Sequence, residues 1–459
     1  GELQNLNGAN WELEIGCITA LNWRRNNPMA LLFDNIQDYP QGFRVLTSST
    51  SNTRRVALTF NVPPVTSPGE LVNIFRVKLK EWESDLDKYS MKWVTSGPVL
   101  ENVDSGNSIN LWKFPVPKWH EMDGGRYIGT GDAVITGDPD TGQVNMGTYR
   151  VQVHDEKTTA LFIIPGKHGR IHVDKYHARG KPSPVLVSVG HHPLIFRTAS
   201  SEMPPGGEFK YIGAVMGESL PVIKEEVTGL PMPADSEIVL AGFCPPDKTM
   251  PEGPFGEWTG YYASGETPTH ILEVQRVYYR NDPILMGSPP GKAPSDSSFY
   301  RGIITSAILY NDLETSGVPD IRGVWMGEAA NQMLVIVSIK QRYAGHAKQT
   351  ALLASQLARK GFFGRYVIVV DEDIDPTNIP EVLWAMCTRS DPEKDIDIIR
   401  RCWSTVMDPI LPKSKGGYFN SRAIIDACKP YEWINEFPQE IKISPELAKR
   451  VREKWKDIV

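Results

Sequence analysis

The sequence predicts a multidomain α+β protein: an N-terminal α+β domain, a central β-rich barrel or sandwich, and a C-terminal α/β domain that ends in a helix. Its 459 residues exceed what one compact core usually holds, which indicates two or three domains. The middle of the chain carries short β-branched runs between Gly, Pro and Asp, whereas the last third alternates apolar strands with helical patterns. These changes set the predicted boundaries at 1–100, 101–298 and 305–459.

The N-terminal region mixes helical and strand patterns. Leu71–Trp82 predicts a helix, because apolar residues recur among charges at helical spacing. The chain has no initiator Met and begins with Gly1 as if inside an element, so we expect some N-terminal sequence to be missing.

The central region predicts many short strands. The β-branched runs are Ala133–Thr136, Ala160–Ile164, Val185–Val189, Glu237–Leu240 and Ile271–Tyr279. Between the first two lies Gly137–Gly142, with the sequence Gly-Asp-Pro-Asp-Thr-Gly, which predicts a hairpin turn because Pro presets φ and Gly accepts positive φ. Strands at this spacing are typical of a barrel or a sandwich.

The C-terminal region predicts a parallel sheet covered on both faces. Met333–Ile339 and Tyr366–Val370 are wholly apolar strands, and Ala347–Lys360 between them is a helix with Gly361 as its C-cap. A last helix opens at Ser444-Pro445-Glu446, with Leu447, Val451 and Trp455 four residues apart on one face. That apolar stripe must pack either on its own domain or on a neighbouring subunit.

Composition and charge exclude several classes of function. The net charge of −6 and pI of about 5.9 provide no concentrated basic surface for nucleic acid or an anionic membrane. The five cysteines form no C-x-x-C pair, which favours a reducing compartment over a disulfide framework or a thiolate zinc site. We find no 18-residue apolar run and no signal-like start, and therefore expect a cytoplasmic protein.

The segment Pro251–Glu257 holds the first candidate chemistry. Two Pro and two Gly fix a non-helical path that places two carboxylates, Glu252 and Glu257, five residues apart. Apolar neighbours such as Phe255 and Trp258 would raise a carboxyl pKa toward the range of a general acid. The alternative is a solvated Gly/Pro loop with two incidental surface acids.

Four further side chains have open roles. Arg150 could hold a substrate carboxylate or pair with the acids of 251–257, or it could form a strand-end salt bridge. Asn145, His168 and Glu208 together would suit Mn2+ or Mg2+, although their spacing fits no local metal motif. The chain has no G-x-G-x-x-G after a strand, no P-loop, no H-E-x-x-H and no G-x-S-x-G.

Several segments of the chain resemble the UbiD family of decarboxylases. They occur in the family's order and extend over nearly the whole chain. The segment 251–262 resembles the family hallmark and is closest to members that act on ferulic, aromatic or heteroaromatic acids. Further matching segments are Asp123–Thr130, Asn145–Arg150, Ile164–His168, Glu208–Ala214, Ala234–Leu240, Tyr343–Lys348 and Val382–Arg389.

The resemblance implies a central split β-barrel, like that of flavin reductases, that binds prenylated FMN. A divalent metal, Mn2+ or Mg2+, and K+ would link the cofactor phosphate to the protein. The implied metal ligands are Asn145, His168 and Glu208. The implied cofactor and K+ contacts are Thr130, Thr148, Tyr149, Arg150, Lys167, Ser201, Met203, Glu208 and Arg422, the last standing where some members have Lys.

The implied reaction is reversible non-oxidative decarboxylation of an aromatic or heteroaromatic acid, hydroxylated or not, through a covalent adduct with prenylated FMN. Arg150, paired with Glu252, would orient the substrate carboxylate, and Glu257 would protonate the carbon that loses CO2. The aromatic side chains of Trp258, Tyr261 and Tyr262 would suit a planar substrate, or they could simply pack.

Three other interpretations stay open. The substrate could be an α,β-unsaturated acid of the cinnamic type. The protein could be a flavin reductase-like FMN-binding protein or a cofactor carrier, which has no need of Glu252 and Glu257. A structural oligomerising protein is supported only by the last helix.

The expected partners are a small carboxylate and CO2, further copies of the chain in a dimer or hexamer, and a prenylated-FMN synthase for maturation.

Overall fold

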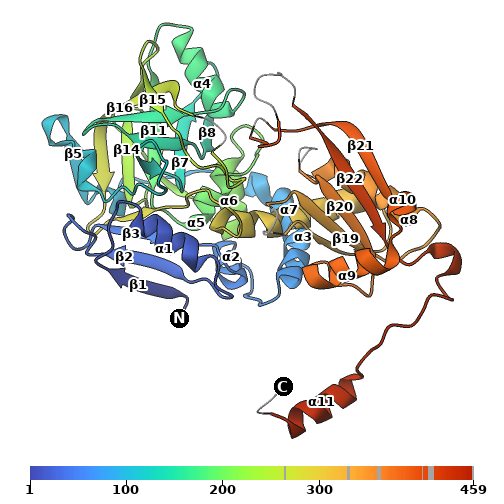
Figure 1. The fold of residues 1–459 in the computed structure, drawn as a ribbon. Coiled ribbons are helices and arrows are strands. Elements are labelled where there is room, and N and C mark those ends of the chain that lie inside the picture. Colours follow the sequence, from blue (N-terminus) through green and yellow to red (C-terminus); the bar gives the residue numbers. More distant parts are fainter. Residues whose placement is uncertain (263–264, 328–330, 359–362, 406, 412–417, 457–459) are drawn as a thin grey trace.

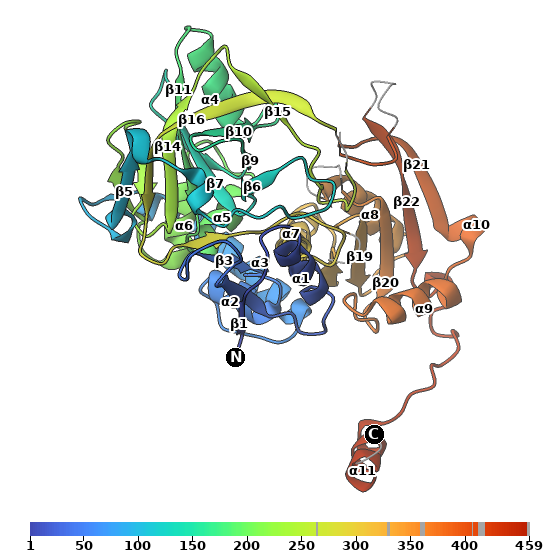
Figure 2. The same ribbon diagram turned by 60° about the vertical axis from the view of Figure 1, so that its left-hand side comes forward.

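The computed structural model of the chain (Figure 1) describes residues 1–262, 265–327, 331–358, 363–405, 407–411 and 418–456. Two bodies stand side by side: one holds the N-terminal and central regions, and the other holds the C-terminal sheet (Figures 1 and 2). Helix α7, Asp296–Thr315, lies between them. The predicted multidomain α+β fold is confirmed. No described helix is long and apolar enough to cross a membrane.

The N-terminal region forms a four-stranded sheet in the order β1-β2-β3-β17. Its strands are β1 Leu3–Asn7, β2 Ala30–Asp34, β3 Arg44–Thr47 and β17 Ile284–Met286, and its helices are α1 Glu14–Asn22, α2 Thr53–Thr59 and α3 Pro68–Asp85. Strand β17 comes from far along the chain, so this sheet ties the first residues to the end of the central region. The predicted helix at 71–82 is confirmed within α3, which buries Leu71, Phe75 and Trp82.

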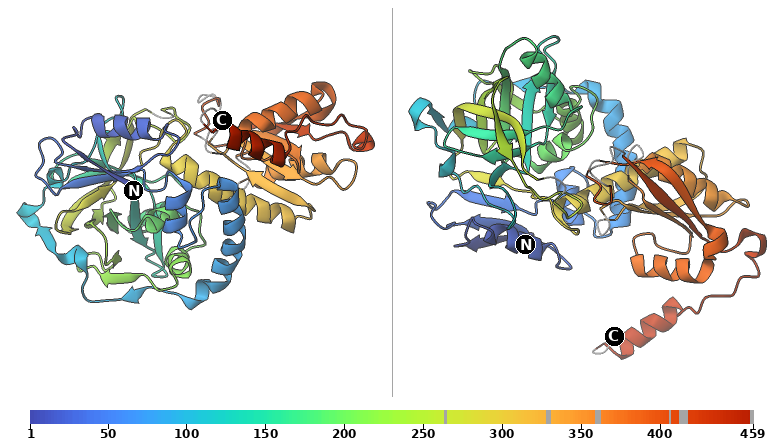
Figure 3. Two further views of the ribbon diagram at one scale, coloured as in Figure 1. Left: turned by 90° about the horizontal axis from the view of Figure 1, so that it is seen from below. Right: turned by 45° about the horizontal axis from the view of Figure 1, so that its top comes forward.

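The central region forms a curled ten-stranded sheet, seen end-on in Figure 3. Its main path runs β6-β9-β10-β16-β14-β11-β7-β8, and β5 and β15 also pair with β16. The strands are β5 Asn102–Ser105, β6 Arg126–Gly129, β7 Asp132–Gly137, β8 Val144–Gly147, β9 Arg150–Val153, β10 Thr158–Phe162, β11 Ser183–Val189, β14 Ile238–Cys244, β15 Thr249–Glu252 and β16 Thr267–Tyr279. The predicted strands and the 137–142 hairpin, which joins β7 to β8, are confirmed with small shifts of their ends.

Three helices cover this sheet, and a small second sheet lies beside it. The helices are α4 His168–His177, α5 Pro193–Ala199 and α6 Glu208–Met216, and the small sheet has the order β13-β12-β4, with β13 Pro231–Pro233, β12 Pro221–Lys224 and β4 Lys92–Trp93. A fully buried ion pair joins α5 to α7: Arg197 Nη2 lies 2.6 Å from Asp296 Oδ2. Because both charges lack water, this pair fixes how α7 meets the central body.

The C-terminal region is a five-stranded sheet in the order β18-β19-β20-β22-β21. Its elements are β18 Ile321–Trp325, β19 Leu334–Ile339, α8 His346–Leu357, β20 Tyr366–Asp371, α9 Ile379–Arg389, α10 Pro392–Asp395, β21 Ile396–Trp403 and β22 Phe419–Ala427. The parallel-sheet prediction is correct for β19, β20 and β22, but both edge strands pair antiparallel. The predicted C-cap Gly361 lies outside the described residues.

The last helix, α11 Pro445–Lys454, stands away from the rest of the chain at the end of an extended segment (Figures 1 and 3). Ser444 caps it as predicted, since its side chain accepts a hydrogen bond from the amide of Leu447 at 3.2 Å. Leu447, Val451 and Trp455 are all exposed, so the predicted stripe does not pack on its own domain here.

Candidate functional site

A cleft of about 990 Å³ runs between the central sheet and the C-terminal body. Most of the residues predicted from the sequence line it, although they come from separate strands and helices. They are Thr130, Asn145, Thr148, Tyr149, Arg150, Lys167, His168, Ser201, Met203, Glu208, Glu257 and Trp258. This convergence makes the cleft the candidate active site.

Arg150 bridges the two acids of the 251–257 segment. Its Nη1 donates to Glu257 Oε1 at 2.7 Å, and its Nη2 donates to Glu252 Oε2 at 2.8 Å. The residues lie more than a hundred positions apart in sequence and meet because β9 and β15 both approach β16 through strand pairing. Arg150 is the first residue of β9, and its strand-end salt bridges are the predicted pairing with the acids of 251–257.

The acid segment is packed rather than solvated. Glu252 ends β15 with no exposed surface, and Tyr127 donates to its Oε1 at 3.1 Å. Phe255 is buried and its ring centroid lies 4.0 Å from that of Tyr127. A Cβ on Gly124 would meet the Gly253 carbonyl oxygen at 1.9 Å, so only glycine allows the approach of the two segments. The alternative of a loop with two incidental surface acids is wrong.

The environment of Glu257 suits a proton donor. Burial raises the pKa of Glu257, Arg150 opposes this rise, and the nearby Glu252 carboxylate adds to it. The side chain keeps 12% of its surface exposed and lines the cleft, so a bound molecule can reach it. A carboxyl that holds its proton to higher pH and faces a cleft is equipped for general acid catalysis.

The raised pKa of Glu257 predicts the pH dependence of turnover. The donor form of Glu257 is protonated, so kcat should be steady at lower pH and fall as the pH rises through the raised pKa. An unperturbed Glu would already be ionised above about pH 4.3. Measuring kcat against pH, with circular dichroism at each pH to confirm folding, checks this expectation. A descending limb at the ordinary Glu value would contradict it.

Asn145, His168 and Glu208 stand on one side of the cleft, on β8 and at the first residues of α4 and α6. Buried polar atoms there have no hydrogen-bond partner, namely the Asn145 amide nitrogen and Glu208 Oε2. Burial raises the pKa of Glu208 to about 7. Unpartnered atoms beside a buried carboxyl fit a bound cation, and a mixed oxygen and imidazole set fits Mn2+ or Mg2+.

Asp132 at the start of β7 escaped the sequence analysis. It is fully buried, both carboxylate oxygens lack a hydrogen-bond partner, and burial raises its pKa. The Thr148 hydroxyl, on the cleft wall, donates to the Asp132 carbonyl at 2.9 Å. The signal was an acid opening the apolar run Asp-Ala-Val-Ile, which reads equally well as a residue of the preceding turn.

Four predicted residues lie outside the described cleft lining, and the first is Glu252, which is buried and bonded to Arg150. Arg422, on β22, is buried and donates to the Trp403 carbonyl at 3.2 Å, and it does not belong to the described cleft lining. Tyr261 and Tyr262 also stand outside that lining, whereas Trp258 is part of it. Contact between Arg422 and the cofactor therefore stays a prediction, because Arg422 does not line the cleft in this structure.

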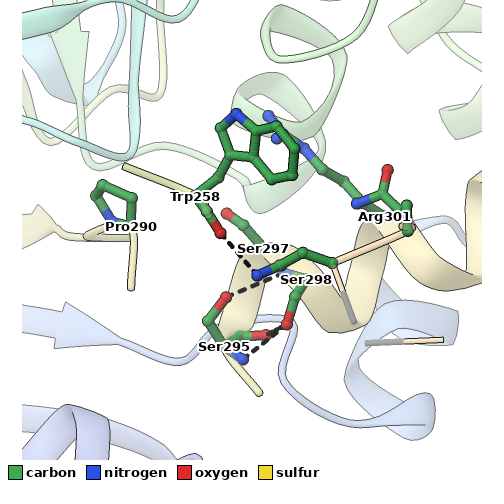
Figure 4. Close-up of a pocket in the computed structure, with 8 residues that line it drawn as sticks. Trp258, Pro290, Ser295, Ser297, Ser298 and Arg301 are labelled. Atoms are coloured by element: carbon green, nitrogen blue, oxygen red, sulfur yellow. Dashed lines mark hydrogen bonds between the residues drawn. The ribbon is translucent and has the colours of Figure 1, made fainter. Parts of the chain in front are cut away.

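Trp258 connects the acid segment to α7 and to the C-terminal body. Its carbonyl accepts from Asn331 Nδ2 at 2.7 Å. Figure 4 shows the small pocket beside this contact, where Trp258 meets Ser295, Ser298 and Arg301 at the start of α7. The Trp258 indole lies 3.3 Å from Met407 Sδ and packs edge-on against Phe363. Trp258, which follows the candidate proton donor Glu257, is thus held in place by residues of the C-terminal body.

Three family models match the chain in sequence order. They describe the N-terminal, Rift-related and C-terminal domains of 3-octaprenyl-4-hydroxybenzoate carboxy-lyase, at residues 1–75, 92–293 and 298–427. A pyrrole-2-carboxylic acid decarboxylase of Pseudomonas aeruginosa is 31% identical over 97% of this chain and 92% of its own length. A phenolic acid decarboxylase of Bacillus subtilis is 30% identical over 94% and 90%.

Solved structures resemble the whole fold. The vanillic acid decarboxylase of Sedimentibacter hydroxybenzoicus in open form matches with a TM-score of 0.86 and 28% identity, over 100% of this chain and 96% of that one. The UbiD-class enzyme HmfF of Pelotomaculum thermopropionicum, in complex with FMN, matches with a TM-score of 0.85 and 25% identity, over 99% and 97%.

Proposed function

Since this chain belongs to the UbiD family of carboxy-lyases, we propose that it is a prenylated-FMN-dependent decarboxylase of an aromatic or heteroaromatic acid. The observation that carries the proposal is Arg150 held between Glu252 and Glu257 at the wall of the cleft. A flavin reductase or a cofactor carrier has no use for this arrangement, because neither moves a proton to carbon.

Each residue of the trio takes one role. Arg150 presents a permanent charge to the substrate carboxylate and orients it, and Glu252 keeps the guanidinium in place from behind. Glu257 delivers its proton to the carbon that loses CO2, and the raised pKa leaves that proton available. Phe162 and Phe255 flank the guanidinium at 4.2 and 5.5 Å and exclude water from the carboxylate subsite.

Prenylated FMN, when bound, supplies a covalent electron sink for the pair released as CO2 leaves. Asn145, His168 and Glu208 would hold a divalent metal, Mn2+ or Mg2+, that receives the cofactor phosphate, with K+ near Thr130, Ser201 and Met203. The unpartnered polar atoms of Asn145 and Glu208 support this assignment. Thr148, Tyr149 and Lys167 line the same wall and would contact the cofactor.

The aromatic substrate class rests on the relatives and on the lining. Relatives similar to this chain are named for pyrrole-2-carboxylic and phenolic acids. Here Phe255, Trp258, Phe363, Trp403 and Tyr418 line the cleft, and their flat faces suit a planar ring. A cinnamic-type acid, which also carries a ring, remains the alternative substrate.

The function is tested with chain co-expressed with a prenylated-FMN synthase. Pyrrole-2-carboxylic, vanillic, protocatechuic and cinnamic acids are screened for CO2 release, and the matching ring products for deuterium exchange at the carbon that bore the carboxyl. We expect turnover of a ring carboxylate. Flavin-loaded protein that exchanges no deuterium into any of these products, and releases no CO2, would contradict the proposal.

The exposed stripe of α11 supports a homo-oligomer in which α11 docks on a neighbouring subunit. The region 305–459 would then combine an α/β domain with an oligomerisation helix, beside an N-terminal domain at 1–100 and a cofactor-binding domain at 101–298. We expect a chain truncated after residue 440 to be a monomer, because the truncation removes the apolar stripe. Light scattering should then give the molar mass of one chain. An unchanged mass would show that other surfaces hold the subunits together.

A further inference from the structure

A second group of metal-ligating side chains lies outside the cleft, at the far end of α4. Asp174 and His177 stand in the last turns of this helix, and His270 comes from β16. One ligand atom of each residue lies within 4.8 Å of the ligand atoms of the other two. Among the residues that the structure describes, no other trio of His, Cys, Asp or Glu meets this criterion.

His270 is half-buried, and its ring nitrogens lack the hydrogen bonds that buried polar atoms normally make. Both of its ring nitrogens are buried and neither has a hydrogen-bond partner. Its ring meets that of His177 edge to face, with the centroids 5.0 Å apart. A buried polar group without a partner costs free energy, so an imidazole in this state beside a second imidazole calls for a ligand.

One ring nitrogen of His177 is engaged by a hydrogen bond, which leaves the other as the ligand atom. Its Nε2 lies 3.0 Å from the carbonyl oxygen of Cys244. A carbonyl oxygen can only accept, so Nε2 carries the proton and the neutral ring keeps its lone pair on Nδ1. Metal-bound histidines are held by this kind of hydrogen bond from the second ring nitrogen to a backbone carbonyl.

Asp174 completes the set from the solvent side. Arg170 Nε lies 2.8 Å from Asp174 Oδ1, which leaves Oδ2 to bind an ion. The Asp174 side chain is 54% exposed, so an ion has a route in and water can complete its coordination. The C-terminal end of a helix also favours a cation, because the backbone dipoles point their negative ends there.

We propose that Asp174, His177 and His270 bind a divalent transition-metal ion of the Zn2+ class, with water completing the coordination. Two imidazoles with one carboxylate favour Zn2+ and its neighbours over Mg2+ or Ca2+, which prefer oxygen ligands. Ligand atoms around a tetrahedral Zn2+ are roughly 3.3 Å apart, so the side chains must close by at most about 1.5 Å.

The ion would brace two elements that also serve the cleft. Helix α4 begins with His168, and β16 pairs with β15, where Thr249 lies opposite His270 and Glu252 lies opposite Thr267. An ion that joins the C-terminal end of α4 to β16 ties together the supports of His168 and Glu252. This role does not depend on the proposed reaction.

Zinc titration of the full chain tests the site. Glu208→Gln is introduced first so that the proposed metal site of Asn145, His168 and Glu208 in the cleft does not contribute to zinc binding. The protein is then stripped of metal with a chelator. Calorimetry with Zn2+ alone should give one site in this background. Adding His270→Gln should weaken binding by on the order of 100-fold or more, since even outer-shell partners cost 10- to 100-fold. His154→Gln is the matched control, because His154 also has a buried unpartnered ring nitrogen but stands outside the trio.

Two further readouts separate binding from folding. Zn2+ should raise the Tm of the Glu208→Gln chain and of the His154→Gln control but not of the His270→Gln variant. Asp174→Asn, at an exposed position, provides a second loss of a ligand should His270→Gln fail to fold. The proposal is overturned if the Glu208→Gln chain takes up no Zn2+, or if both ligand variants bind it as tightly as that background.

Discussion

Glu257→Gln should lower kcat by about 10²–10⁴-fold, the range that a positioned general acid contributes. The amide has nearly the same shape and still accepts the hydrogen bond from Arg150 Nη1, but it has no proton to deliver to carbon. The measurement is the rate of CO2 release under saturating substrate, together with deuterium exchange into the product. Flavin absorbance should be unchanged, because Glu257 is not among the residues assigned to the cofactor.

Trp258→Phe is the control for packing of the same segment. It removes the contact of the indole N–H with Met407 but keeps a ring against Phe363 and leaves both acids in place. We expect it to cost far less activity than Glu257→Gln. Full activity in Glu257→Gln would show that another group donates the proton and would remove the assigned role.

Arg150→Met should destabilise the protein by about 3–5 kcal/mol and abolish measurable turnover. The substitution leaves Glu252, which has no exposed surface, without its cationic partner, and breaking one side of a buried pair costs this much. The substrate carboxylate also loses its only assigned cation. Urea unfolding gives the stability change, and CO2 release gives the activity.

The pH dependence of this destabilisation checks its cause. Arg150 opposes the rise that burial causes in the pKa of Glu257, so without Arg150 the stability lost at neutral pH should be partly recovered as the pH falls and Glu257 takes up a proton. Arg276→Met is the control, since Arg276 pairs with Glu226 at the surface and its loss should cost within about 1 kcal/mol. A deficit of Arg150→Met that does not change with pH would contradict the ionic explanation.

Element types were predictable from the sequence where burial leaves a regular pattern. The runs at 133–136 and 185–189 lie on β7 and β11, both faces of which are covered, so continuous β-branched residues marked them. Strand β17 has only three residues and pairs with β3, about 240 positions earlier, and no local pattern marks such a partner. The antiparallel edges of the C-terminal sheet were missed because apolar content indicates burial and not direction.

The residues of the site could be named only through the family resemblance. Alone, Arg150 and Glu252 read as a salt-bridge former and a loop acid, because the pairing that joins them runs through β16. The trio at Asp174 carried no recognisable spacing either, since His270 is about a hundred residues from its partners. Long-range strand register, which short sequence patterns do not encode, decides both sites.

The contacts of Trp258 make the placement of the proton donor a linked equilibrium. Its indole and carbonyl are held by Met407, Phe363 and Asn331, which lie beyond α7, while Glu257 next to it is held by Arg150 of the central sheet. A ligand that binds more tightly when these contacts are made must, by reciprocity, favour that arrangement of the two bodies to the same extent. For such a ligand, the free energy of binding is shared between filling the cleft and setting the acid in position.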